Sequence, residues 1–76
     1  MMTVTELSGV HAGQTWRDRD PRCGDRRVRV TRTALQNGVA YVYYRQVIGQ
    51  NPDGRVFRSL YRRFQRAFTL LSSEGQ

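Results

Sequence analysis

Arginine is the residue type whose number and spacing in this chain point most directly to chemistry. The sequence contains thirteen arginines and no lysine, and the stretch that holds them, Arg17 to Arg66, contains only four carboxylates, a local net charge of +9 against +7 for the chain. A guanidinium group donates two parallel hydrogen bonds to a phosphate or carboxylate and stacks on aromatic rings, which an ammonium group does not. So positive a domain repels itself unless its charges pair internally or meet a polyanion.

Three of these arginines occupy predicted strand positions that would share one face with a tyrosine. Arg27, Arg29 and Arg58 would lie beside Tyr44 on that face. Basic side chains around an aromatic ring are typical of a nucleic-acid surface, because the charges follow the phosphate backbone while the ring stacks on a base. The alternative is an ordinary solvated strand face in an arginine-rich protein.

A second group of arginines lies near the C-terminus, where Arg62 and Arg66 would extend the same surface from a helical turn. The alternative is a solvated helix face with one arginine tied to an aspartate. With the strand positions, these two complete the predicted nucleic-acid-binding set, which is Arg27, Arg29, Tyr44, Arg58, Arg62 and Arg66.

A dense patch of alternating charge surrounds the single tryptophan. Its arginines could grip phosphates, but we favour a structural role for the patch. In that interpretation Trp16 anchors the core, while Asp18 and Asp20 pair with arginines such as Arg22 and Arg63 and so hold a loop to the chain end.

Codon usage is the simplest explanation for the remaining arginines. A GC-rich genome supplies arginine in place of lysine without any selection for phosphate binding, although it does not explain the excess of positive over negative charge. No role is therefore assigned to Arg19, Arg26, Arg32, Arg45 and Arg55.

Catalytic and metal chemistry find little support in the sequence. With one cysteine and one histidine, the chain can form neither an intrachain disulfide nor a structural zinc site of four N or S ligands. Arg22 beside Cys23 could lower the pKa of the thiol, but His11 is the only histidine that could act as its base. We predict no enzyme activity, no catalytic residue, no cofactor and no metal.

Four strands are expected to position these side chains. They are Gln14–Asp18, Arg26–Leu35, Val39–Ile48 and Arg55–Leu60, chosen for alternating or β-branched sequence. Asn37-Gly38 predicts a type I′ hairpin turn, because both residues tolerate positive φ. Asn51 to Gly54 predicts a second turn, in which the glycine takes the left-handed position. Arg19 to Asp25, with a proline and a glycine, predicts a loop.

The segment from Leu60 to Leu71 has two interpretations. Its apolar residues recur at helical spacing, which favours one basic amphipathic helix of about three turns. The other interpretation is a single helical turn, Tyr61 to Gln65, followed by a closing strand, Ala67 to Leu71. The series of short strands before it favours this second version, because so small a sheet needs closure.

The two predicted turns determine which side chains share a face, since cross-strand partners lie on the same side of a sheet. The predicted core face consists of Val28, Val30, Tyr41, Tyr43, Val47 and Phe57. The opposite face consists of Arg27, Arg29, Thr31, Val42, Tyr44, Ile48, Val56, Arg58 and Leu60. A single β-bulge would exchange part of this assignment.

One pattern carries a resemblance to a known group. The run Gly13-Gln14-Thr15-Trp16-Arg17-Asp18, followed by Asp20 and Arg22 and later by Arg63-Phe64, resembles small phage and actinobacterial proteins of unknown function. These look like compact SH3-like β-barrels, and the resemblance implies that Arg63-Phe64 lies in a turn before the closing strand. A longer third strand and the extension from Val47 to Gly54 depart from the pattern.

Together these observations predict a mainly β fold, a five-stranded SH3-like small barrel with a short helical turn before the last strand. The alternative is a β-meander with a C-terminal amphipathic helix. Residues 1–8 would form a loose segment, 9–71 a single domain and 72–76 a polar tail.

The predicted function is a phage or bacterial accessory protein that binds DNA or RNA through backbone charge. The alternative is a module that docks on an acidic host protein. With one cysteine and no apolar run of about 20 residues, we expect no membrane and the host cytoplasm.

Overall fold

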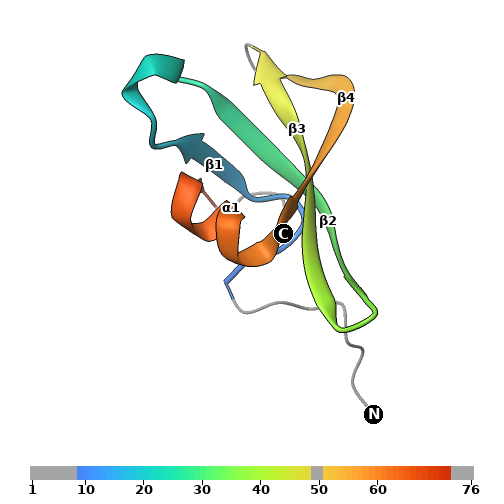
Figure 1. Cartoon of the computed structure of the whole chain (residues 1–76). Helices are drawn as coiled ribbons and strands as arrows, with labels where there is room; N and C mark the ends of the chain where they lie inside the picture. The colour runs from blue at the N-terminus through green and yellow to red at the C-terminus, as the bar shows by residue number, and fades with distance from the viewer. Residues whose placement is uncertain (1–8, 49–50, 73–76) are drawn as a thin grey trace.

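The chain forms five strands and two short helical segments (Figure 1), and the computed structural model describes residues 9–48 and 51–72. In chain order the elements are β1 (Thr15–Asp18), η1 (Pro21–Cys23), β2 (Arg27–Gln36), β3 (Val39–Ile48), β4 (Asn51–Leu60), α1 (Tyr61–Ala67) and β5 (Phe68–Ser72). All neighbouring strands are antiparallel, and the order across the sheet is β4-β3-β2-β1-β5. The mainly β fold is therefore confirmed. The segment predicted as loose, residues 1–8, lies outside the described residues.

The C-terminal segment adopts the split form, a short helix followed by a strand. Helix α1 ends where the backbone N–H of Phe68 bonds to the Phe64 carbonyl, and the chain then pairs with β1 through Trp16↔Leu70 and Asp18↔Phe68. Pairing satisfies the edge of β1 that one long helix would have left open. Among the described residues no pairing joins β4 to β5, so closure into an SH3-like barrel stays a prediction.

The first predicted turn is confirmed and the second is wrong. Asn37 and Gly38 both have positive φ, 53° and 80°, as a type I′ turn requires. The residues of the second predicted turn instead belong to β4, whose pairing with β3 begins at Ile48↔Asn51. Gly54 is not among the glycines with positive φ. The register of β3 and β4 shifts between Arg45 and Val47, so these residues lie at an irregularity in an edge strand, a position that tolerates proline.

A bulge in β2 decides which side chains enter the core. Pairing runs from Gln36↔Val39 to Arg32↔Tyr43 as predicted, then shifts by one residue to Val30↔Tyr44. The extra residue is Thr31, whose hydroxyl donates to the Tyr43 carbonyl at 3.2 Å. Relative to the core residues Val28 and Val30, the two faces of β3 are therefore exchanged from the prediction. Tyr41, Tyr43 and Val47, expected in the core, lie on the opposite side of the sheet.

The core lies on one side of the sheet and is built around aromatic rings. Its buried members are Val10, Trp16, Val28, Val30, Val42, Tyr44, Phe64 and Phe68. Phe64 extends from α1, is fully buried and lies 4.6 Å from Phe68, 5.1 Å from Trp16 and 5.4 Å from Tyr44 between ring centroids. Helix α1 therefore covers the core face (Figure 1). Val10, which is fully buried, shows that the segment before β1 also contributes to the core.

Candidate nucleic-acid interface

The side of the sheet opposite the core, called the outer face below, gathers nearly half of the arginines. Strand register places there six arginines and two tyrosines, namely Arg17, Arg27, Arg29, Arg32, Arg45, Arg58, Tyr41 and Tyr43. They come from β1, β2, β3 and β4, so the positive charge spans most of the sheet. No aspartate or glutamate occupies a paired position on this face among the described side chains.

These residues lie in rows across the strands. One row pairs Arg17 with Arg27, a second pairs Arg29 with Arg45, and a third runs from Arg32 through Tyr43 to Arg58. Successive residues on one face of a strand are about 6.6 Å apart, and neighbouring strands are about 4.8 Å apart. The face is thus a grid of guanidinium groups spaced closely enough to contact consecutive phosphates.

The outer arginines are held by different partners. Arg27 donates to the exposed carboxylate of Asp25 at 3.1 Å. The guanidinium of Arg32 lies over the Tyr43 ring, 3.9 Å from its centroid, and that of Arg58 lies over Tyr41 at 4.5 Å. A guanidinium over a ring keeps its N–H groups free at the edges while its plane is fixed. The two stacked arginines therefore present donors in a defined orientation.

The predicted strand group is partly right. Arg27, Arg29 and Arg58 share one face, as expected from the sequence. The prediction that Tyr44 joins them is wrong, because the residue is only 9% exposed and its ring centroid lies within 5.6 Å of those of Phe57, Phe64 and Phe68. Burial also raises the pKa of the Tyr44 hydroxyl.

Sequence reasoning missed several members of the outer face. Tyr41 and Tyr43 are the tyrosines that accompany the arginines, and Arg32 and Arg45, which codon usage alone could explain, belong with them. The β2 bulge that exchanges the tyrosines has no clear signal in the local sequence. The alternation of Arg45 with Tyr43 and Tyr41 along one strand could have identified the set.

The two arginines of the helical group lie on α1 and hold no strand position on the outer face. Arg62 and Arg66 are exposed on α1, which packs its Phe64 on the core side of the sheet. Arg62 lines a groove at the end of the sheet with Gly38, Val39, Ala40, Leu60 and Tyr61. Arg62 therefore borders the outer face near Leu60, whereas α1 places Arg66 on the side that carries the core.

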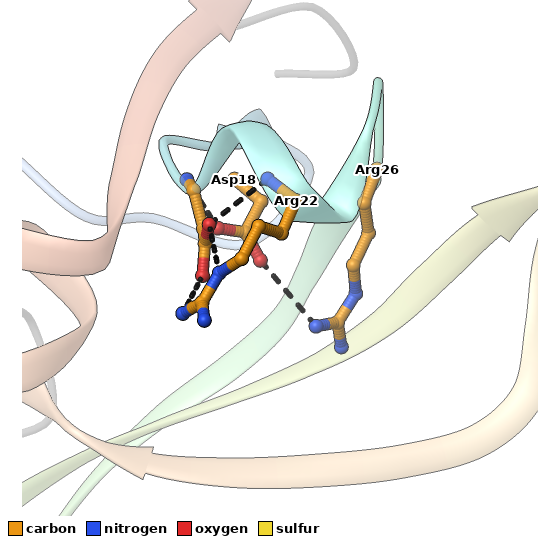
Figure 2. Close-up of polar contacts among 4 residues, drawn as sticks. Asp18, Arg22 and Arg26 are labelled. Atoms are coloured by element: carbon orange, nitrogen blue, oxygen red, sulfur yellow. Dashed lines mark hydrogen bonds and ion pairs between the residues drawn. The ribbon is translucent and has the colours of Figure 1, made fainter.

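The loop between β1 and β2 is held by its own charges (Figure 2). Arg22 forms a two-pronged contact with Asp20 through Nε and Nη2, at 3.1 and 3.0 Å, and this guanidinium holds the pKa of Asp20 below its usual range. Asp18 accepts from the backbone N–H of Asp20 at 2.9 Å and from Arg26 at 3.4 Å. Asp18 and Asp20 are thus structural within the loop.

The tie between this loop and the chain end is made by a different arginine from the one expected. Among the described residues, the ion pairs of Asp20 and Asp18 are with Arg22 and Arg26, and neither is with Arg63. Instead the backbone N–H of Arg19 bonds to the Ala67 carbonyl, and its Nε donates to the Thr69 hydroxyl, both at 2.9 Å. Arg19, for which the sequence alone suggests no role, therefore anchors the loop to the start of β5.

Other candidate chemistry remains sparse in the part of the chain that the structure describes. Cys23 is exposed, but desolvation, a hydrogen bond with Asp18 and nearby carboxylate charge raise the pKa of its thiol. Neighbouring guanidinium therefore does not activate it. Within residues 9–48 and 51–72, no group of three His, Cys, Asp or Glu side chains could hold a metal ion, and no helix has the length and hydropathy needed to span a membrane.

Comparisons with protein-family models, curated proteins and solved structures returned no match to this chain. Functional inference therefore depends on the geometry and charge of the outer face.

Proposed function

We propose that this protein binds nucleic acid through the phosphate backbone, with the outer face as the contact surface. The observation that supports this most directly is the set of six arginines on one sheet face with no carboxylate at any described paired position. Phosphate charge supplies most of the affinity of non-specific binding, and arginine contacts phosphate in a two-pronged geometry. The outer face provides that charge on a rigid sheet.

The structure favours backbone contact over base stacking as the source of affinity. Tyr44 is in the core, and the rings of Tyr41 and Tyr43 each lie under a guanidinium group. A base would have to displace Arg58 or Arg32 to reach either ring. The proposed complex is therefore held chiefly by charge and depends weakly on sequence.

Salt dependence is the measurement that tests the proposal. If five of the six outer arginines contact phosphates, the slope of log K against log salt on duplex DNA should be about −4.5, at ~0.9 per contact. Fluorescence anisotropy with a labelled duplex, from low salt upward, measures this slope. Absence of binding at low salt, or a flat response, would refute the proposal.

A matched pair of variants locates the surface. Arg27, Arg29 and Arg58 changed together to Gln should remove two to three phosphate contacts and bring the slope to about −1.8 to −2.7. The control changes Arg55, Arg63 and Arg66 to Gln, an equal loss of charge at exposed positions away from the outer face. Binding should survive in the control. Circular dichroism establishes that both triple variants remain folded, and equal loss of binding in the two would contradict the assignment to the outer face.

An acidic protein partner is the competing function, because arginine and tyrosine are also enriched at protein interfaces. Pull-down from a bacterial lysate, with and without nuclease, separates the two. Capture of a single protein that persists after nuclease treatment would show that the ligand is a protein and not nucleic acid. We further propose a phage or bacterial accessory role in the host cytoplasm, supported by the resemblance in the sequence and by the single cysteine.

A further inference from the structure

The centre of the outer face contains two arginines placed directly opposite each other. Arg29 of β2 pairs with Arg45 of β3, so their Cβ atoms are about 5 Å apart on the same side of the sheet. The strands that flank this row place Thr15 beside Arg29 and Val56 beside Arg45, and neither can supply negative charge. Like charges directly opposite destabilise a sheet, so this pair has a cost in the free protein.

These two side chains also have unmet hydrogen-bonding capacity. The Nε atoms of both Arg29 and Arg45 are buried and have no hydrogen-bond partner, and they are the only such side-chain atoms in the part of the chain that the structure describes. In the neighbouring rows, Arg27 meets Asp25 and Arg32 lies over Tyr43. A buried N–H without a partner costs free energy, which an acceptor could recover.

We propose that Arg29 and Arg45 together bind one phosphate group, a phosphodiester of the nucleic acid. This proposal rests on the proposed function and identifies one subsite within it. A single phosphate between two guanidinium groups accepts charge-assisted hydrogen bonds from both and neutralises the repulsion between them. Because both Nε atoms are buried, each side chain must rotate to direct its Nε–H toward the same oxygens. The flanking rows then contact phosphates on either side of the central one.

Thermal unfolding in inorganic phosphate tests the subsite without nucleic acid. At 10 mM phosphate, a site with a Kd of about 1 mM raises Tm by roughly 6–11 °C over chloride at matched ionic strength. Phosphate also stabilises proteins generally, so the comparison is between variants. Arg45→Gln should lose the site-specific gain, whereas Arg66→Gln, with the same change in charge on exposed α1, should keep it.

Three results of this experiment would overturn the subsite. The first is an equal phosphate response in Arg45→Gln and Arg66→Gln. The second is an equal response of the wild-type protein to acetate, which would indicate a carboxylate site. The third is a phosphate-induced rise in the Tm of the wild-type protein that is no larger than the rise measured for Arg29→Gln. In chloride alone, Arg45→Gln should have a Tm at least as high as that of Arg66→Gln, because it removes the repulsion.

Binding to duplex DNA then separates one shared phosphate from two. If Arg29 and Arg45 hold the same phosphate, changing both to Gln lowers the magnitude of the salt slope by about 0.9, the value of one contact. A decrease of about 1.8 would show two separate phosphates and refute the shared site. If the wild-type protein binds no DNA, the proposed function fails, and the phosphate response still tests the anion site by itself.

Discussion

The exchange of neighbouring tyrosines between core and surface leads to a sharp prediction about stability. Tyr44 is 9% exposed and has three aromatic rings within 5.6 Å, whereas Tyr43 is half-buried on the outer face under Arg32. Truncating a buried aromatic residue to Ala costs about 3–5 kcal/mol. Losing an exposed cation–π contact costs about 0.5–1 kcal/mol. Tyr44→Ala should therefore be several times more destabilising than Tyr43→Ala.

The magnitude can be compared with the whole stability of the domain. A chain of 76 residues has an expected unfolding free energy of about 4–11 kcal/mol. With Tm falling by roughly 4–8 °C per kcal/mol, Tyr44→Ala should lose at least about 12 °C and approach complete unfolding. Tyr43→Ala should lose about 8 °C or less. Thermal unfolding followed by far-UV circular dichroism measures both losses in Tm. The larger loss in Tyr43→Ala would refute the Thr31 bulge and restore the uninterrupted register.

Three further predictions follow from local geometry. Gly38→Ala should lower stability by about 1–2 kcal/mol, because Gly38 has φ 80°, while Gly54→Ala, an exposed glycine without positive φ, should be neutral or slightly stabilising, as measured by urea titration. The buried side-chain oxygen of Gln14 accepts hydrogen bonds from the backbone N–H of His11 and the indole N–H of Trp16. Gln14→Leu leaves both donors without this partner and should lower the free energy of unfolding by about 1–3 kcal/mol for each. A lower urea midpoint would confirm the loss of stability, which a shift of tryptophan fluorescence alone would not. The ion pair of Asp20 with Arg22 contributes stability that is present above pH ~3.9 and is lost as pH falls through the lowered pKa of Asp20. Asp20→Asn removes this contribution, so the Tm values of variant and wild type should differ at neutral pH and converge in acid. A difference that stays constant with pH would contradict the pairing with Arg22.

Element types were predictable because local signals agreed with the pairing. The hairpin at Asn37-Gly38 was predicted from two residues that tolerate positive φ, and the β-branched run after it became β3 with the expected bounds, Val39–Ile48. Helical periodicity alone would have extended α1 through Leu71. The helix ends at Ala67 instead, because the following residues pair with β1, a contact that no local pattern reports.

The candidate site was less predictable, since it depends on register. One extra residue, Thr31, reverses the faces of β3 and so moves Tyr44 inward and Tyr43 outward. Arg27 and Arg29 lie on the far side of that bulge from the turn, yet they remain opposite the core because Val28 and Val30 alternate with them. Alternation within one strand was therefore reliable. Inference across strands failed at the first irregularity.

The position of β1 between β2 and β5 has a consequence for how the chain folds. The β2–β3–β4 meander joins strands that are consecutive in sequence, but β5 must return to β1, and Arg19 meets Thr69 across 50 positions of sequence. The chain loses conformational entropy when that long loop closes, and it does so before any contact of β5 compensates for the loss. Folding should accordingly be limited by docking of the final strand, on the millisecond-to-second scale of non-local β topologies. Until β5 docks, the core side of the meander and the Phe64 ring of α1 remain exposed to water.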